Sequence, residues 1–194
     1  KINSRDVQEN PDRGLVFRSG IMDWSDCSAM TIGTITDASH GGEDEWIEVT
    51  KTLEPYRSQG GRLNVLATKD IADGDECKIH VISYASALVK RVCRATLQAE
   101  AYTLQNGVES GDVLRAGVVE LFGRLTKDWE ASAAEAMQHV WCCDAESVVS
   151  ALNRPVLGKI QDKRLAIELA AMRQSLWRRP GATKGDPRLD DEKP

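Results

Sequence analysis

Four carboxylates occupy positions that ordinary solvent exposure does not explain. Asp37 and Asp144 each follow an apolar run typical of a strand, and Glu100 borders the apolar stripe of a predicted helix. A carboxylate at the carboxyl end of a buried strand lies at the usual active-site edge of an α/β sheet. Glu168 borders the apolar stripe of the last predicted helix in the same way. A carboxylate near a core face is costly unless it has a basic partner or a cation.

Convergence of these four acids would create a site for hard divalent cations. Magnesium prefers a few carboxylates together with water and phosphate oxygens. Two such ions about 4 Å apart can activate a water molecule and stabilise the leaving oxygen of a phosphodiester. The alternative is that Asp37 and Asp144 cap the turn or helix that follows, and that Glu100 pairs with Lys90 or Arg94. Spacing alone leaves both interpretations open.

The elements that must position these acids follow from the hydrophobic periodicity. Strands are predicted over 30–37, 62–68 and 78–85, and an Asp-Gly turn signal precedes the third. Residues 43–48 are predicted to form an acidic loop. Helices are predicted over 94–108, 113–125, 131–137, 146–152 and 160–177, with a strand over 138–144. We expect an α/β fold with a mixed sheet, in which an antiparallel three-strand meander and parallel strands are flanked by helices.

The chain of 194 residues has the length of one domain. We predict an N-terminal arm or linker over 1–28, the domain over 29–179 and a flexible tail over 180–194. The polar start is not a signal peptide, and no apolar run is long enough for a membrane span. Because the first residue is not Met, and the ending resembles a truncation, we expect a piece of a longer protein.

The charge and the cysteine content argue against two classes of protein. There are 25 basic and 30 acidic residues, a net charge of −5, which argues against a non-specific nucleic-acid coat. Basic residues nevertheless concentrate locally: residues 153–179 hold seven against two acidic ones, and Lys90, Arg91 and Arg94 precede the first helix without an acid. The five cysteines include no CxxC pair, so buried free thiols are expected and a structural zinc site is not. Cys142 and Cys143, adjacent in a strand, should face opposite sides of the sheet.

Several short segments, taken in order, carry a resemblance to a known family. They are Thr36-Asp37-Ala38-Ser39, Arg57-Ser58-Gln59-Gly60, Ile82-Ser83-Tyr84-Ala85-Ser86, the run from Cys93 to Tyr102, Cys143-Asp144, and the run from Asp162 to Glu168. Over residues 31–178 the chain resembles the ribonuclease H domain of copia-type retrotransposon Pol polyproteins. The resemblance implies a ribonuclease H-like fold and cleavage of the RNA strand of an RNA–DNA hybrid. It also implies a cofactor of two Mg²⁺ ions, with Mn²⁺ as a substitute.

The resemblance assigns residues as well. Asp37, Glu100 and Asp144 match the metal-binding, catalytic acids. Strict register places the fourth acid at Ala166, so we choose Glu168, with Asp162 as the runner-up. No histidine follows His139, although many ribonucleases H carry a loop histidine near the fourth acid. The basic residues expected to contact the hybrid phosphates are Lys90, Arg91, Arg94, Lys163 and Arg164.

The family context also implies partners and a location. The reverse transcriptase and integrase regions of the same polyprotein would be partners, no membrane would be involved, and the location would be intracellular, in the cytoplasm or nucleus as part of a retroelement particle. Two alternatives stay open. One is a catalytically degenerate remnant that keeps the fold and only binds nucleic acid or packs. The other is a different ribonuclease H-like enzyme, such as a transposase or exonuclease, although the early meander and the glutamate on the first helix favour the ribonuclease H branch.

Overall fold

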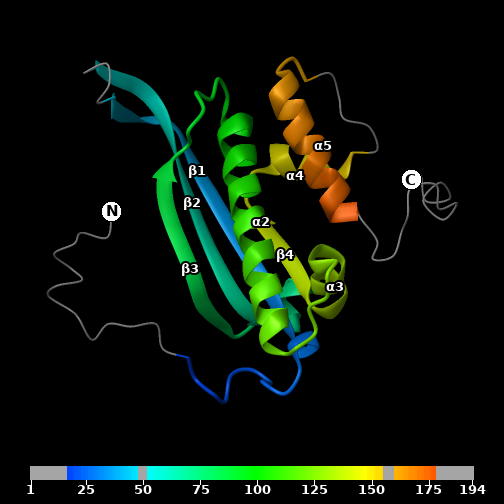
Figure 1. Cartoon of the computed structure of the whole chain (residues 1–194). Coiled ribbons are helices and arrows are strands. Elements are labelled where there is room, and N and C mark those ends of the chain that lie inside the picture. Colours follow the sequence, from blue (N-terminus) through cyan, green and yellow to red (C-terminus); the bar gives the residue numbers. More distant parts are fainter. Residues whose placement is uncertain (1–16, 48–51, 155–159, 178–194) are drawn as a thin grey trace, which may run out of the picture.

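A four-stranded mixed sheet forms the centre of the molecule (Figure 1). The computed structural model describes residues 17–47, 52–154 and 160–177. The strand order is β3-β2-β1-β4, with β1 (Met30–Ile47), β2 (Thr52–Thr68), β3 (Ile79–Leu88) and β4 (Gln138–Cys143). The pairs β1–β2 and β2–β3 are antiparallel, and the pair β1–β4 is parallel. The α/β class and the mixed sheet with an antiparallel meander are therefore confirmed.

The first hairpin is longer than the sequence predicts. Strand β1 continues through residues 43–47, so the predicted acidic loop is wrong for these residues. Pairing runs without a shift from Met30↔Thr68 to Ser39↔Gln59, slips by a bulge, and resumes at Glu43↔Arg57. Gly41 lies within the bulge with φ 67°, a conformation that glycine adopts without steric cost. The acidic side chains do not prevent strand pairing here, because the hydrogen bonds between strands join backbone N–H and C=O groups.

One long helix crosses the sheet where two shorter helices are predicted. Helix α2 (Thr96–Leu121) is continuous, so the predicted interruption between 108 and 113 is wrong. The glycines that suggested an interruption instead allow a close approach to β1. A Cβ atom on Gly107 would lie 2.6 Å from Cγ2 of Thr36, and one on Gly111 would lie 2.5 Å from Oγ1 of Thr34. These positions are glycine because β1 lies directly beneath them, and the helix passes over without ending.

The remaining helices pack beside α2. They are α3 (Trp129–Ala136), α4 (Glu146–Asn153) and α5 (Lys163–Trp177), close to the predicted helices 131–137, 146–152 and 160–177. Two short 3₁₀ turns are present: η1 (Cys27–Ala29) directly precedes β1, and η2 (Lys69–Ala72) lies between β2 and β3. Among the described helices, none has both the length and the apolar character that a bilayer crossing requires.

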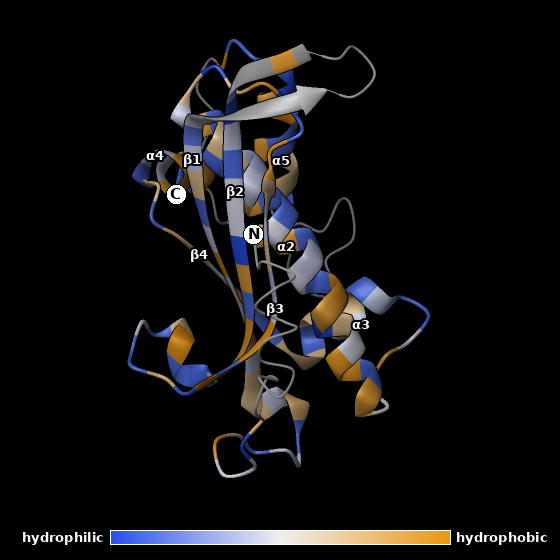
Figure 2. Cartoon of the chain, turned by 90° about the vertical axis from the view of Figure 1, so that its left-hand side faces the viewer, coloured by the Kyte–Doolittle hydropathy of each residue, from blue (hydrophilic) through white to orange (hydrophobic). Residues whose placement is uncertain are grey.

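The core divides along the length of α2. The first cluster joins the carboxyl-terminal half of α2 to the sheet and to α3, and Figure 2 shows α2 and α3 on the same side of the sheet. Its main members are Met30, Ile32, Leu66, Val119 and Met137. The second cluster joins the amino-terminal half of α2 to α4 and α5, through Leu104, Val148, Leu165 and Leu169. Helix α2 therefore packs between the sheet on one side and helices α4 and α5 on the other, and this packing fixes the position of the turn that carries Glu100.

The predicted domain limits are only partly covered by the description. Met22, within the predicted arm 1–28, is 7% exposed and belongs to the first core cluster, so the end of that arm packs on the domain. Residues 1–16 and the tail 180–194 lie outside the described residues. The limits 1–28, 29–179 and 180–194 stay predictions.

Candidate metal centre

The carboxyl end of β4, the middle of β1 and one helical turn meet at one place on the sheet. The parallel register places Thr36 of β1 beside Cys143 of β4, so Asp37 and Asp144 follow the same rung of the ladder. Helix α2 begins at Thr96 and carries Glu100 in its second turn. Its start is fixed by Gln98, whose Oε1 accepts a hydrogen bond of 2.6 Å from the backbone N–H of Arg94. The sequence predicted that a strand ends at each aspartate. Strand β4 does end before Asp144, but β1 continues past Asp37 to Ile47, so the parallel pairing of the two strands, and not a shared strand end, brings Asp37 and Asp144 together.

Glu100 is the buried member of this site. Its side chain is 5% exposed, and a carboxylate oxygen lies within 4.8 Å of both a carboxylate oxygen of Asp144 and Sγ of Cys143. We name these three residues the Glu100–Cys143–Asp144 cluster. The backbone N–H of Ala38 donates a hydrogen bond to the Glu100 carboxylate. Oxygen Oε2, however, is buried and has no hydrogen-bond partner among the described residues.

The pKa of Glu100 reflects this environment. Burial raises it above its ordinary value, the N–H of Ala38 lowers it in part, and the negative fields of Asp144 and Asp37 raise it further. The alternative in which Lys90 or Arg94 neutralises Glu100 finds no support in the described residues, where no ion pair joins Glu100 to either. A buried carboxylate with a free oxygen beside a second carboxylate is a donor set that suits a divalent cation.

Asp37 lies beside the cluster and outside its 4.8 Å limit. Its side chain is exposed, and its charge acts on Glu100 through space. The next residue, Ala38, supplies the N–H that holds Glu100. The three acids expected to share a site are therefore neighbours, and the two that lie within 4.8 Å of each other in the cluster are Glu100 and Asp144.

Cys143 is a member of the cluster that the sequence analysis did not assign to a site. Burial raises the pKa of its thiol, the backbone N–H of Ala145 lowers it, and the fields of Glu100 and Asp144 raise it. Burial raises the pKa of Cys142, and Cys77 raises it further. In the parallel register Cys142 pairs with the exposed Ile35 and Cys143 with the buried Thr36, in agreement with the prediction that the adjacent cysteines face opposite sides. The signal that could have revealed Cys143 is the strand alternation, combined with a register that pairs it with the buried Thr36.

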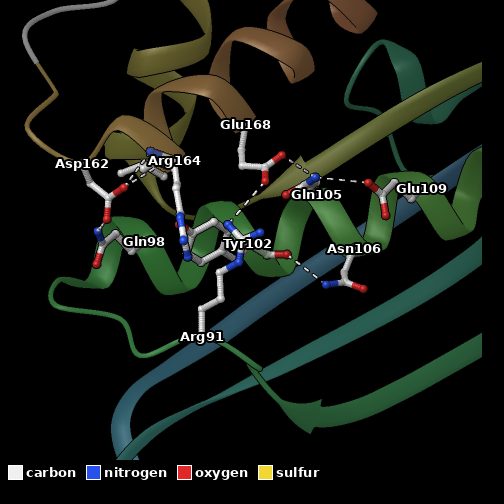
Figure 3. A network of polar contacts seen from close by, with 10 residues as sticks. Arg91, Gln98, Tyr102, Gln105, Asn106, Glu109, Asp162, Arg164 and Glu168 are labelled. Carbon is white, nitrogen blue, oxygen red and sulfur yellow. Dashed lines mark hydrogen bonds and ion pairs between the residues drawn. The ribbon is translucent and has the colours of Figure 1, made fainter.

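Glu168 lies in a separate polar network (Figure 3). Its Oε1 is 3.4 Å from Nη1 of Arg91, and its Oε2 accepts a hydrogen bond of 2.7 Å from Nε2 of Gln105. Gln105 is five residues beyond Glu100, which rotates it about 140° around the axis of α2. The carboxylates whose negative fields raise the pKa of Glu100 are those of Asp144 and Asp37. The structure does not bring Glu168 into the cluster.

Asp162, the runner-up for the fourth acid, directly precedes helix α5. Its Oδ1 accepts from the backbone N–H groups of Arg164 and Leu165, at 2.8 and 3.1 Å. Its Oδ2 accepts a hydrogen bond of 2.8 Å from Nε2 of Gln98, which ties the start of α5 to the start of α2 (Figure 3). Neither candidate for the fourth acid joins the cluster, and Ala166 offers no ligand, so the identity of a fourth acid stays a prediction.

The basic residues expected to contact a substrate fall into two groups. Lys90, Arg91 and Arg94 lie in the loop between β3 and α2, and Lys163 and Arg164 lie exposed at the start of α5. Lys90 and Arg91 line an open cavity of about 320 Å³, together with residues of β2, β3 and α2 and with Glu168 of α5. The Arg91 guanidinium lies 5.0 Å from the centre of the Tyr102 ring.

Two arginines that sequence reasoning missed support this loop and cavity. Arg57, 7% exposed, donates from Nη2 to the carbonyl oxygens of Val89 and Lys90 at 3.1 and 3.0 Å. Arg62 lines the same cavity, and its Nε is buried without a hydrogen-bond partner among the described residues. Their positions on β2 carry no sequence signal, because they depend on the pairing of β2 with β3.

Comparisons with known proteins provide no relative of this chain, because no family model, curated protein or solved structure matches it. A functional assignment therefore depends on the residues of the chain and on their geometry.

Proposed function

We propose that this chain is a metal-dependent endonuclease that hydrolyses the RNA strand of RNA–DNA hybrids, similar to the ribonuclease H domain of copia-type retrotransposons. The observation that carries the proposal is the free, buried Oε2 of Glu100, within a cluster that includes Asp144 and beside Asp37. The sheet adds support, because an antiparallel meander followed by a helix and a strand parallel to β1 is compatible with a ribonuclease H-like fold.

The metal ligands in this proposal are Glu100, Asp144 and Asp37. Bound Mg²⁺, or Mn²⁺ in its place, supplies an activated water molecule and stabilises the departing 3′ oxygen. The protein contributes a preformed geometry: the N–H of Ala38 orients one part of the Glu100 carboxylate, and burial keeps the other oxygen free of competing partners. Exposed Asp37 and Asp144 leave the site open to a phosphodiester. Products would carry a 5′ phosphate and a 3′ hydroxyl.

Substrate binding is assigned to the basic residues around this site. Lys90, Arg91 and Arg94 would contact phosphates together with Lys163 and Arg164, which the hydrogen bond from Gln98 to Asp162 holds near them. Selection of the RNA strand would come from its 2′-hydroxyl groups in a wide minor groove. In this proposal the reverse transcriptase and integrase regions of one polyprotein are the partners, within an intracellular retroelement particle.

A second candidate is a degenerate remnant that binds nucleic acid without cutting it. The observation that favours it is the fourth position: Ala166 has no ligand atom, and Glu168 is held by Arg91 and Gln105. A site with three acids binds cations less strongly than one with four, because each missing carboxylate removes charge.

One assay separates the two candidates. A labelled RNA–DNA hybrid is incubated with Mg²⁺ and the parent chain, Asp37→Asn, Asp144→Asn, or Asp73→Asn as a matched control in an exposed turn far along the chain. We expect cleavage by the parent and by Asp73→Asn, and at least a hundredfold loss in the other two. Hybrid binding without cleavage by the parent would favour the remnant. Equal cleavage by all four proteins would refute this assignment of the acids.

A further inference from the structure

A sulfur atom accompanies the two carboxylates of the cluster. Sγ of Cys143 and oxygens of Glu100 and Asp144 are all within 4.8 Å of one another. Magnesium and manganese take oxygen ligands, whereas a thiolate selects borderline-soft cations such as Zn²⁺. The donor set of two oxygens and one sulfur is therefore better matched to zinc than to magnesium.

The geometry of the cluster suits such an ion. Glu100 is 5% exposed and its Oε2 has no partner among the described residues, so one ligand is already desolvated and free. Cys143 is half-buried and Asp144 is exposed, which leaves a route from solvent. Three protein donors with an open fourth position are the arrangement of reactive zinc sites, as opposed to closed structural ones.

We propose that the Glu100–Cys143–Asp144 cluster binds a thiophilic divalent cation of the Zn²⁺ class, in competition with Mg²⁺. On binding, the Cys143 thiol gives its proton to solvent and a sulfur–metal bond forms, with no change of oxidation state. This inference rests on the proposed function in one respect: the Mg²⁺ that zinc would displace is the ion that cleavage requires. An excess of zinc would then inhibit cleavage of the hybrid.

Cadmium is the probe, because its bond to a thiolate produces an ultraviolet charge-transfer band. The full chain is titrated with Cd²⁺ under reducing conditions, together with Cys143→Ser, Glu100→Gln and the matched control Cys142→Ser. Cys142 is the neighbouring half-buried cysteine on the opposite face. We expect one equivalent of the band in the parent and in Cys142→Ser, its loss in Cys143→Ser, and at least tenfold weaker binding in Glu100→Gln. Added Mg²⁺ should move the parent's Cd²⁺ midpoint to higher concentration.

The contrary results are equally specific. An undiminished band in Cys143→Ser, a loss confined to Cys142→Ser, or a Cd²⁺ midpoint insensitive to Mg²⁺ would overturn the proposal. Circular dichroism of each variant verifies folding, and Cys143→Ala provides a second substitution if the serine variant unfolds. Cleavage assays keep the two proposals separate. A parent that cuts hybrids while Cys143→Ser binds Cd²⁺ normally refutes only the zinc site, and a parent that fails to cut but shows the expected band refutes only the nuclease.

Discussion

Replacement of Glu100 by glutamine should stabilise the metal-free protein. The substitution keeps the size of the side chain and removes its charge. Glu100 is only 5% exposed, and its Oε2 has no hydrogen-bond partner among the described residues. A buried polar group without its partner costs about 1–3 kcal/mol, and more when it is charged. We therefore expect Glu100→Gln to raise the free energy of unfolding by about 1–3 kcal/mol in a chelating buffer near neutral pH. For a chain of this size that corresponds to an increase in Tm of about 2–12 °C.

The pH dependence has a definite sign. The folded-state pKa of Glu100 lies above its ordinary value of 4.5, so the folded protein holds this proton more tightly than the unfolded chain. The contribution of the group to stability is complete below the unfolded pKa and is lost as pH rises through the raised folded pKa. The stability difference between Glu100→Gln and the parent should consequently be small in acid and increase as pH rises above 4.5.

Denaturant unfolding at several pH values, with and without Mg²⁺, measures these effects. The matched control is Glu109→Gln, which removes an exposed carboxylate from the same helix. Magnesium at a hundred times its Kd should stabilise the parent by about 2.7 kcal/mol and leave Glu100→Gln nearly unchanged. The reasoning is refuted if Glu100→Gln is no more stable than Glu109→Gln without metal, or if the difference decreases as pH rises.

Two further predictions concern the helix α2 and the loop before it. Gly111→Ala should lower the free energy of unfolding by about 1–3 kcal/mol, because its Cβ would meet β1. Gly117→Ala, whose Cβ would meet no atom within 4 Å, should instead raise the free energy of unfolding by up to about 1 kcal/mol. Thermal unfolding of the two variants tests this prediction, and equal destabilisation of both would contradict the close approach of α2 to β1. Arg91→Ala should weaken binding of an uncleavable RNA–DNA hybrid and reduce the slope of log K against log salt by about one. Exposed Lys127→Ala is the control, and an unchanged slope in Arg91→Ala would remove Arg91 from the substrate contacts.

The location of the acids was predictable where it depends on periodicity. Strand patterns before Asp37 and Asp144, together with a crossover that makes their strands parallel, are sufficient to bring the two acids together, although β1 continues past Asp37 to Ile47 and the predicted strand end there is wrong. The apolar stripe of α2 was sufficient to turn Glu100 inward. These features follow from repeats of two and 3.6 residues, which a sequence displays directly.

Features that depend on strand register, or on how closely two elements approach each other, could not be predicted from the sequence. Gly107 and Gly111 are indistinguishable in sequence from helix-ending glycines until β1 is placed beneath them. Glu168 borders the core stripe of α5, but the rotation of that helix directs it to Arg91 and Gln105 and away from Glu100. The role of Cys143 required the pairing of β4 with β1.

The buried Arg57 has a consequence for recognition. Its guanidinium fixes two successive carbonyl groups, those of Val89 and Lys90, in the loop that carries Lys90 and Arg91. A loop held in this way has already given up much of its conformational entropy before a ligand arrives, so binding does not have to order its backbone. Loss of the Arg57 side chain should therefore weaken binding to any polyanion mainly through an unfavourable entropy change, even though Arg57 itself touches no ligand.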